Sequence, residues 1–142
     1  MIASAFPLLF VLLAIVVLGV TGNLFSASPM AVAAQVAAVA LNVWARVSFQ
    51  KGTFRVTAAP GGTSIIRSGP YRFIRHPMYS AALLFVWAAV ASHLSVLTVA
   101  IGIAVAGLCI IRVRVEDRLL RAAYPEYLAY SQSTKALVPY VF

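Results

Sequence analysis

A histidine directly precedes a proline near the middle of this 142-residue chain, within the segment 68–79, Ser-Gly-Pro-Tyr-Arg-Phe-Ile-Arg-His-Pro-Met-Tyr. Pro77 favours the first turn of a helix and pushes His76 towards an extended conformation. The free amides and partial positive charge of that helix start lie beside Arg75 and His76, which predicts a site for a carboxylate or phosphate. The alternative is an interfacial anchor, in which Arg72 and Arg75 contact lipid phosphates and the tyrosines join an aromatic belt.

Two adjacent carboxylates, Glu116 and Asp117, stand out in a chain with only three acidic residues. Two i, i+4 pairs with arginine are available: Arg112 with Glu116, and Asp117 with Arg121. An exposed, ion-paired helix end is therefore one interpretation. In the other, antiparallel packing of the helices before and after residue 93 returns Glu116 to Arg75 and His76. An anion site and a cation site would then face each other, as a ligand such as S-adenosylmethionine requires.

A third group of polar residues, Gln35, Asn42 and Arg46, interrupts an apolar segment at i, i+7 and i+11. This spacing places the three side chains on one face of a helix. Polar groups at membrane depth usually face the bundle interior or a cavity. Hydrogen bonding between helices and the lining of a substrate cavity are both open interpretations.

The elements that must position these residues are predicted to lie in a membrane. Hydrophobic side chains make up 63% of the chain and charged ones 10%, with a mean hydropathy of +0.96. Such an apolar content far exceeds that of a soluble domain. Lipid is therefore the expected solvent.

The net charge of +8 is distributed unevenly. No Lys or Arg precedes Arg46, and all eleven lie within 46–75 or 112–135. This is the pattern of positive-inside loops and argues against a nucleic-acid-binding surface. We therefore expect both termini in the cytoplasm and the chemistry on that side of the membrane.

The predicted fold class is all-α, a polytopic membrane helix bundle in one integral membrane domain, 1–142. The four expected spans are about 2–20, 30–49, 78–91 and 94–113, joined by a cytoplasmic loop at 50–77 and followed by a cytoplasmic tail at 114–142. The apolar run from 78 to 113 would form a helix of about 50 Å, too long for a hydrocarbon core of about 30 Å. We expect it to break at Ser92, His93 and Ser95.

At these motifs the chain resembles the isoprenylcysteine carboxyl methyltransferase family, which is related to the phospholipid N-methyltransferases. The matching pieces are Gly69-Pro70-Tyr71, Arg75-His76-Pro77-Met78-Tyr79, the acidic pair with Leu120, and the Tyr127/Tyr130 tail up to Pro139. They cover residues 65 to 139, about half the chain. The family's second acid is usually Glu, whereas this chain has Asp117. Residues before 50 match no family motif.

The resemblance implies an integral membrane enzyme that transfers a methyl group from S-adenosylmethionine to a lipophilic carboxylate or amine. Arg75 and Glu116 are the expected catalytic residues, with Arg75 organising carboxylate charge. The implied cofactor contacts are Gly69, Pro70, Tyr71, His76, Pro77, Tyr79 and Glu116, and no metal is expected. Gln35, Asn42 and Arg46 are the expected substrate contacts. Methyl transfer is an in-line displacement that needs mainly proximity and alignment, so the lack of a nucleophile-base pair suits it.

Two alternatives remain at this point. Membrane-embedded NADPH-dependent sterol or enone reductases share a similar Arg-His-x-x-Tyr segment and a Val-Pro-Tyr ending, compare Val138-Pro139-Tyr140. A non-enzymatic protein could instead use the basic face to bind anionic lipid.

The expected partners are membrane lipids and the methyl acceptor. The small residues Gly102 and Ala106, four positions apart, predict a close helix approach, either within the bundle or in a homodimer. The arginine-rich, alanine-rich and valine-rich composition suggests a bacterial source and therefore the inner membrane.

Overall fold

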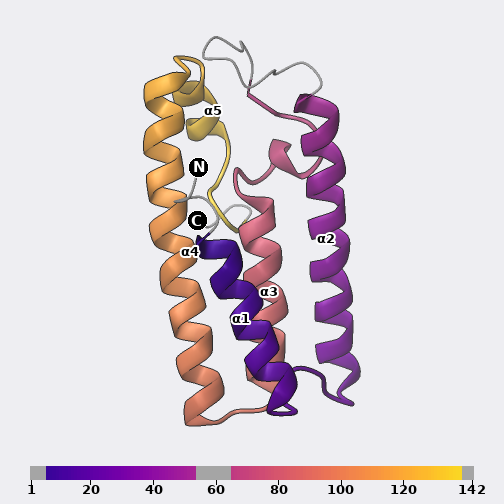
Figure 1. Ribbon diagram of the computed structural model, residues 1–142. Coiled ribbons are helices and arrows are strands. Elements are labelled where there is room, and N and C mark those ends of the chain that lie inside the picture. Colours follow the sequence, from indigo (N-terminus) through magenta and orange to yellow (C-terminus); the bar gives the residue numbers. More distant parts are fainter. Residues whose placement is uncertain (1–5, 54–64, 139–142) are drawn as a thin grey trace. The chain divides into compact units, whose positions relative to one another are not determined.

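The computed structural model describes residues 6–53 and 65–138, and this part of the chain is helical without a strand. Figure 1 shows the elements in chain order. They are α1 (Phe6–Val20), α2 (Pro29–Thr53), the short 3-10 helix η2 (Gly69–Arg72), α3 (Pro77–Ser92), α4 (Val96–Ala123) and α5 (Tyr127–Ser133). The all-helical prediction is confirmed, and the break in the apolar run falls between Ser92 and Val96.

Local sequence explains where these helices begin and end. Pro29 and Pro77 open α2 and α3, where the missing amide removes no helical hydrogen bond. Helix α1 ends in a Schellman turn, because Gly22 has a φ of 72° and the Asn23 amide donates to Leu18 O at 2.8 Å. A residue with a Cβ would be strained at that φ.

The chain is divided into two compact units. Unit 1 comprises Met1–Val39 and Ala81–Arg112, and unit 2 comprises Ala40–Ser80 and Val113–Phe142. Helices α2, α3 and α4 each contribute to both units. The prediction of a single membrane domain stays a prediction.

Unit 1 contains α1 and parts of α2, α3 and α4, with the α1–α2 and α3–α4 turns at one end (Figure 1). Hydrogen bonds tie that end together: Gln35 Nε2 donates to Leu24 O at 2.7 Å, and His93 Nε2 donates to Phe25 O at 2.9 Å. Helices α3 and α4 approach closely at Gly102, where an added Cβ would lie 3.1 Å from Val90 Cγ2. Gly102 is thus one of the small residues through which the sequence predicts close helix approach.

Among the described residues, two helices are long and apolar enough to cross a bilayer, α2 over Pro29–Phe49 and α4. Only 22% and 28% of their apolar windows are buried, unlike the core helix of a soluble protein. Large apolar side chains such as Val39, Ile103 and Ile111 are more than half exposed. An apolar face of this extent is suited to lipid rather than water. The apolar parts of α1 and α3 are shorter, so four spans and cytoplasmic termini stay predictions.

Unit 2 holds the segment 68–79 and the acidic pair, the two motifs in which the sequence predicts the catalytic and cofactor-binding residues. Helix α4 continues ten residues past Val113 to Ala123, as expected for a helix that extends beyond its span. The chain then forms α5 and returns to the start of α3, where Ile74 and Lys135 form an isolated parallel bridge. Arg75 N donates to Lys135 O at 2.8 Å and His76 N donates to Ala136 O at 3.0 Å. The sequence did not predict this return of the tail.

Candidate functional site

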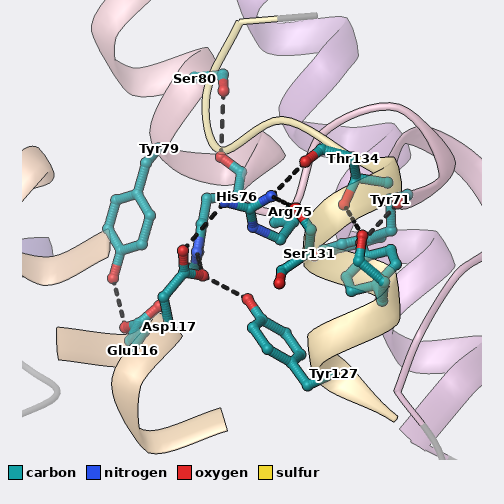
Figure 2. Close-up of polar contacts among 11 residues, drawn as sticks. Tyr71, Arg75, His76, Tyr79, Ser80, Glu116, Asp117, Tyr127, Ser131 and Thr134 are labelled. Carbon is teal, nitrogen blue, oxygen red and sulfur yellow. Dashed lines mark hydrogen bonds and ion pairs between the residues drawn. The ribbon is translucent and has the colours of Figure 1, made fainter. Parts of the chain in front are cut away.

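The His76 side chain lies between the two carboxylates of the acidic pair (Figure 2). Its Nε2 is 2.8 Å from Asp117 Oδ1 and its Nδ1 is 3.5 Å from Glu116 Oε2. Only 6% of the imidazole is exposed. Pro77 fixes the backbone here, because it starts α3 and leaves His76 directly before the first turn. The structure thus brings together the motif and the acidic pair, as antiparallel packing predicts.

The charge state of His76 follows from these contacts. Burial lowers the pKa of the imidazole, but the hydrogen bonds and charges of Asp117 and Glu116 outweigh this effect. The pKa is therefore raised above the ordinary value of 6.5. A raised pKa favours the imidazolium, which bridges two carboxylates.

Asp117 binds three side chains from two segments, the stretch directly before α3 and helix α5. Its Oδ2 accepts from Arg75 Nη2 at 3.2 Å, and its Oδ1 accepts from both His76 and the Tyr127 hydroxyl. The side chain is 13% exposed. Its ion pairs within the described residues are with Arg75 and His76, so of the two interpretations of the acidic pair, the local one with Arg121 does not hold for Asp117. Asp117 therefore pairs with an arginine that is distant in the sequence and not with the arginine one helical turn later.

Glu116 is the more open of the two acids, with 29% of its side chain exposed. Its Oε1 accepts a hydrogen bond from the Tyr79 hydroxyl at 2.7 Å, and its Oε2 faces His76. Helix α4 places Glu116 and Asp117 at consecutive positions, about 100° apart around the axis. The Asp117 carboxylate is therefore enclosed, whereas the Glu116 carboxylate is partly accessible from outside the protein.

Arg75 connects the acidic pair to the C-terminal tail. Its Nη1 donates to Ser131 O at 2.9 Å and also to Thr134 O, while Nη2 binds Asp117. The side chain is 10% exposed. Arg75 therefore organises the Asp117 carboxylate and fixes the tail, and both of its terminal nitrogens are bound to protein atoms.

Two tyrosines of α5, which sequence reasoning left out of the site, complete it. Tyr127 donates to Asp117, and the Tyr130 hydroxyl donates to Tyr71 O at 2.6 Å. Burial and the hydrogen bond to Asp117 raise the pKa of Tyr127, so its hydroxyl remains a donor. Their i, i+3 spacing in the tyrosine-rich tail was the available signal, because it places both rings on one face.

The turn at Gly69 and Pro70 packs directly against α2. Gly69 has a φ of 60°, and a Cβ at this position would lie 2.1 Å from Ser48 Oγ. Glycine is therefore required both by conformation and by space. Tyr71, two residues after Gly69, is 7% exposed, and its ring centroid lies 6.5 Å from that of Phe49.

The predicted polar stripe of α2 is divided between the two units. Gln35 belongs to unit 1, is 5% exposed and uses its amide to bind Leu24 O. In unit 2, Arg46 Nε donates to Asn42 Oδ1 at 2.8 Å, and Arg46 is exposed. Gln35 thus binds the turn between α1 and α2 and not another helix, whereas Asn42 and Arg46 remain accessible.

Chemically, the site combines a partly open carboxylate with hydroxyl and imidazole groups. Glu116 can bind a cation or a diol, and Tyr79 and His76 surround it. Within residues 6–53 and 65–138, no group of three or more His, Cys, Asp or Glu side chains is arranged to hold a metal ion. The geometry is that of a site for a cationic, hydrogen-bonding ligand.

The chain is similar in sequence to known proteins over the region that contains this site. One relative is the cobalt-zinc-cadmium resistance protein CzcN of Cupriavidus metallidurans, 36% identical over 78 residues. The match covers 54% of this chain but only 36% of that protein. No solved structure matches significantly. The family model for phospholipid methyltransferases matches residues 29–127, which include α2, η2, α3, α4 and the acidic pair. The chain belongs to the phospholipid methyltransferase family, and hence to a family of membrane methyltransferases.

Proposed function

We propose that this protein is an S-adenosylmethionine-dependent methyltransferase acting on a lipophilic carboxylate or amine at the cytoplasmic face of a bacterial inner membrane. The observation that carries the proposal is the Glu116 carboxylate, which is 29% exposed between Tyr79 and His76 inside the family-matched region. The four-span topology and the basic cytoplasmic face belong to the same proposal.

The residues present fit the methyl donor at one of its charged ends. Glu116 can accept hydrogen bonds from the donor's ammonium group or its ribose diol, with Tyr79 and His76 beside it. Arg75 is engaged by Asp117, Ser131 and Thr134, which leaves it to position the acidic pair rather than to bind the donor's carboxylate. When bound, S-adenosylmethionine supplies a methyl group already activated by the adjacent sulfonium.

The protein's contribution to such a reaction is alignment. The hub formed by Arg75, His76 and Asp117 is between 6% and 13% exposed, so it fixes the start of α3 against the end of α4. Rigid placement of Glu116 and Tyr79 then sets the position of the donor. A carboxylate acceptor needs no general base, whereas an amine acceptor must be neutral when it attacks.

A binding experiment tests this proposal against the reductase and lipid-binding alternatives. The detergent-solubilised protein is heated with S-adenosylhomocysteine or with NADPH, and the shift in melting temperature is measured. We expect a shift with S-adenosylhomocysteine only, weakened about 10- to 100-fold in affinity by Glu116→Gln, because a charge-assisted hydrogen bond is lost.

Glu126→Gln is the matched control, because it removes the same charge from an exposed position whose Oε1 binds the Ile65 amide. It should leave the affinity unchanged. A shift with NADPH alone would support the reductase, and equal binding by Glu116→Gln would refute the role assigned to Glu116.

A further inference from the structure

The charges around His76 are balanced before any ligand binds. Arg75 Nη2 lies 3.2 Å from Asp117 Oδ2, which pairs one cation with one acid. His76 lies between Asp117 and the second acid, Glu116 (Figure 2). When the His76 imidazole is protonated, these two cations and two carboxylates cancel. A ligand cation that binds at the accessible Glu116 therefore adds one uncompensated positive charge to a largely enclosed cluster.

His76 is the member of this cluster that can give up a positive charge. An arginine guanidinium keeps its proton in proteins. Burial raises the pKa of the Asp117 carboxyl, but hydrogen bonds from three side chains outweigh this effect and hold the pKa below its ordinary value. Asp117 therefore stays ionised. Among the described residues, the titratable and charged groups in contact with His76 or with its two acids are Arg75, Tyr79 of α3, Glu116 and Asp117 of α4, and Tyr127 of α5.

The two ring nitrogens of His76 differ in their partners. Nε2 lies 2.8 Å from Asp117 Oδ1, so a short hydrogen bond to an enclosed carboxylate fixes its proton. Nδ1 lies 3.5 Å from Glu116 Oε2, a longer contact to a side chain that is 29% exposed. Loss of the Nδ1 proton leaves a neutral tautomer whose Nδ1 accepts a hydrogen bond. This nitrogen would then favour a cationic donor beside Glu116, which it repels while protonated.

We propose that a ligand's ammonium group binds between Glu116 and His76 Nδ1 in exchange for the Nδ1 proton. The N–H bond at Nδ1 breaks, the proton passes to the buffer, and the occupied cluster is again neutral. The inference rests on the proposed function, in which the ammonium belongs to the amino-acid end of the methyl donor. A ribose diol at Glu116 would carry no charge and would release no proton.

Calorimetric titration of the full chain in non-ionic detergent counts the released protons. Each ligand is titrated near neutral pH in two buffers with different heats of ionisation, PIPES and ACES, and the difference in binding enthalpy gives the proton number. S-adenosylhomocysteine should release about 0.5 to 1 proton, and its affinity should rise about 3- to 10-fold per pH unit below the pKa of His76. 5′-Methylthioadenosine, which has the ribose diol but no ammonium, should release none.

Two histidine variants identify the source of the proton. His76→Gln should bind S-adenosylhomocysteine without proton release and with an affinity that no longer depends on pH in this range. His93→Gln is the matched control, because it removes the other histidine of the chain, which contacts Phe25 O. It should release the same number of protons as the parent.

Nuclear magnetic resonance keeps the test open if His76→Gln does not fold. The His93→Gln variant has a single imidazole, so its signal reports the protonation of His76 directly. Saturation with S-adenosylhomocysteine should lower the pKa of His76 by at least about one unit. The same titration with Glu116→Gln added should show no such shift, because the carboxylate that binds the ammonium is missing.

The outcomes separate this inference from the proposed function. If S-adenosylhomocysteine binds without proton release, or if both ligands release equal numbers of protons, the exchange is refuted and the methyl-donor site stands. If S-adenosylhomocysteine does not bind at all, the proposed function fails, and ethylammonium at matched ionic strength becomes the probe. A fall in the pKa of His76 that requires Glu116 would then uphold the exchange, and an unchanged pKa would overturn it.

Discussion

Replacement of Asp117 by Asn tests whether this carboxylate holds Arg75 and His76 in place. The side chain is 13% exposed and its charge is shared by Arg75, which is 10% exposed, and His76, which is 6% exposed. The neutral amide of the variant would no longer compensate the positive charges of Arg75 and His76, although it would keep some of the hydrogen bonds to them. Breaking a buried ion pair costs about 3–5 kcal/mol, and the remaining Glu116 charge near His76 reduces this to about 2–4 kcal/mol.

The assay is thermal unfolding of the detergent-solubilised protein, followed by tryptophan fluorescence. A loss of about 2–4 kcal/mol corresponds to a fall of roughly 5–15 °C in melting temperature for a chain of this size. Glu126→Gln, at an exposed position, should lower it by less than about 3 °C. Equal melting temperatures for the two variants would show that Asp117 does not hold Arg75 and His76 in place.

Three further predictions concern neighbouring residues. Because the pKa of His76 is raised on folding, its stabilisation is fully present below the unfolded pKa of about 6.5 and is lost as pH rises through the folded pKa. The melting temperature of the parent minus that of His76→Gln should therefore shrink between pH 6 and pH 9, and a constant difference would contradict this account. Gly69→Ala should destabilise the fold by at least about 2 kcal/mol in denaturant unfolding, because φ is 60° and the new Cβ meets Ser48 Oγ; full stability would refute the close approach. Tyr130→Phe should cost about 1–2 kcal/mol in the same measurement through the lost bond to Tyr71 O, and a neutral effect would show that this bond is unimportant.

Much of the helix pattern was predictable from the sequence because strong local signals determine it. Pro29 and Pro77 open helices, and Ser92 to Ser95 interrupt an apolar run too long for one span. The approach of Glu116 to His76 was also predictable, since a short turn between two helices makes them antiparallel neighbours. These inferences depend only on local chemistry and helix length.

Other contacts depend on tertiary packing and could not be predicted in the same way. Asp117 has an arginine four residues later, yet it pairs with Arg75, which is distant in sequence. The tail segment near Lys135 has no pattern that predicts its pairing with Ile74. Gln35 was grouped with Asn42 and Arg46 by helical spacing, but its amide binds Leu24 O, a partner visible only once the turn after α1 is known.

The central claim, methyl transfer dependent on Glu116, is tested most directly by a labelling experiment. The protein is incubated with S-adenosylmethionine carrying a labelled methyl group and with total bacterial membranes, and label is measured separately in the lipid and protein fractions. The account predicts label in a lipophilic product with the parent and with Glu126→Gln, and a loss of at least about tenfold with Glu116→Gln. No label above the protein-free control, or equal labelling by Glu116→Gln, would contradict it.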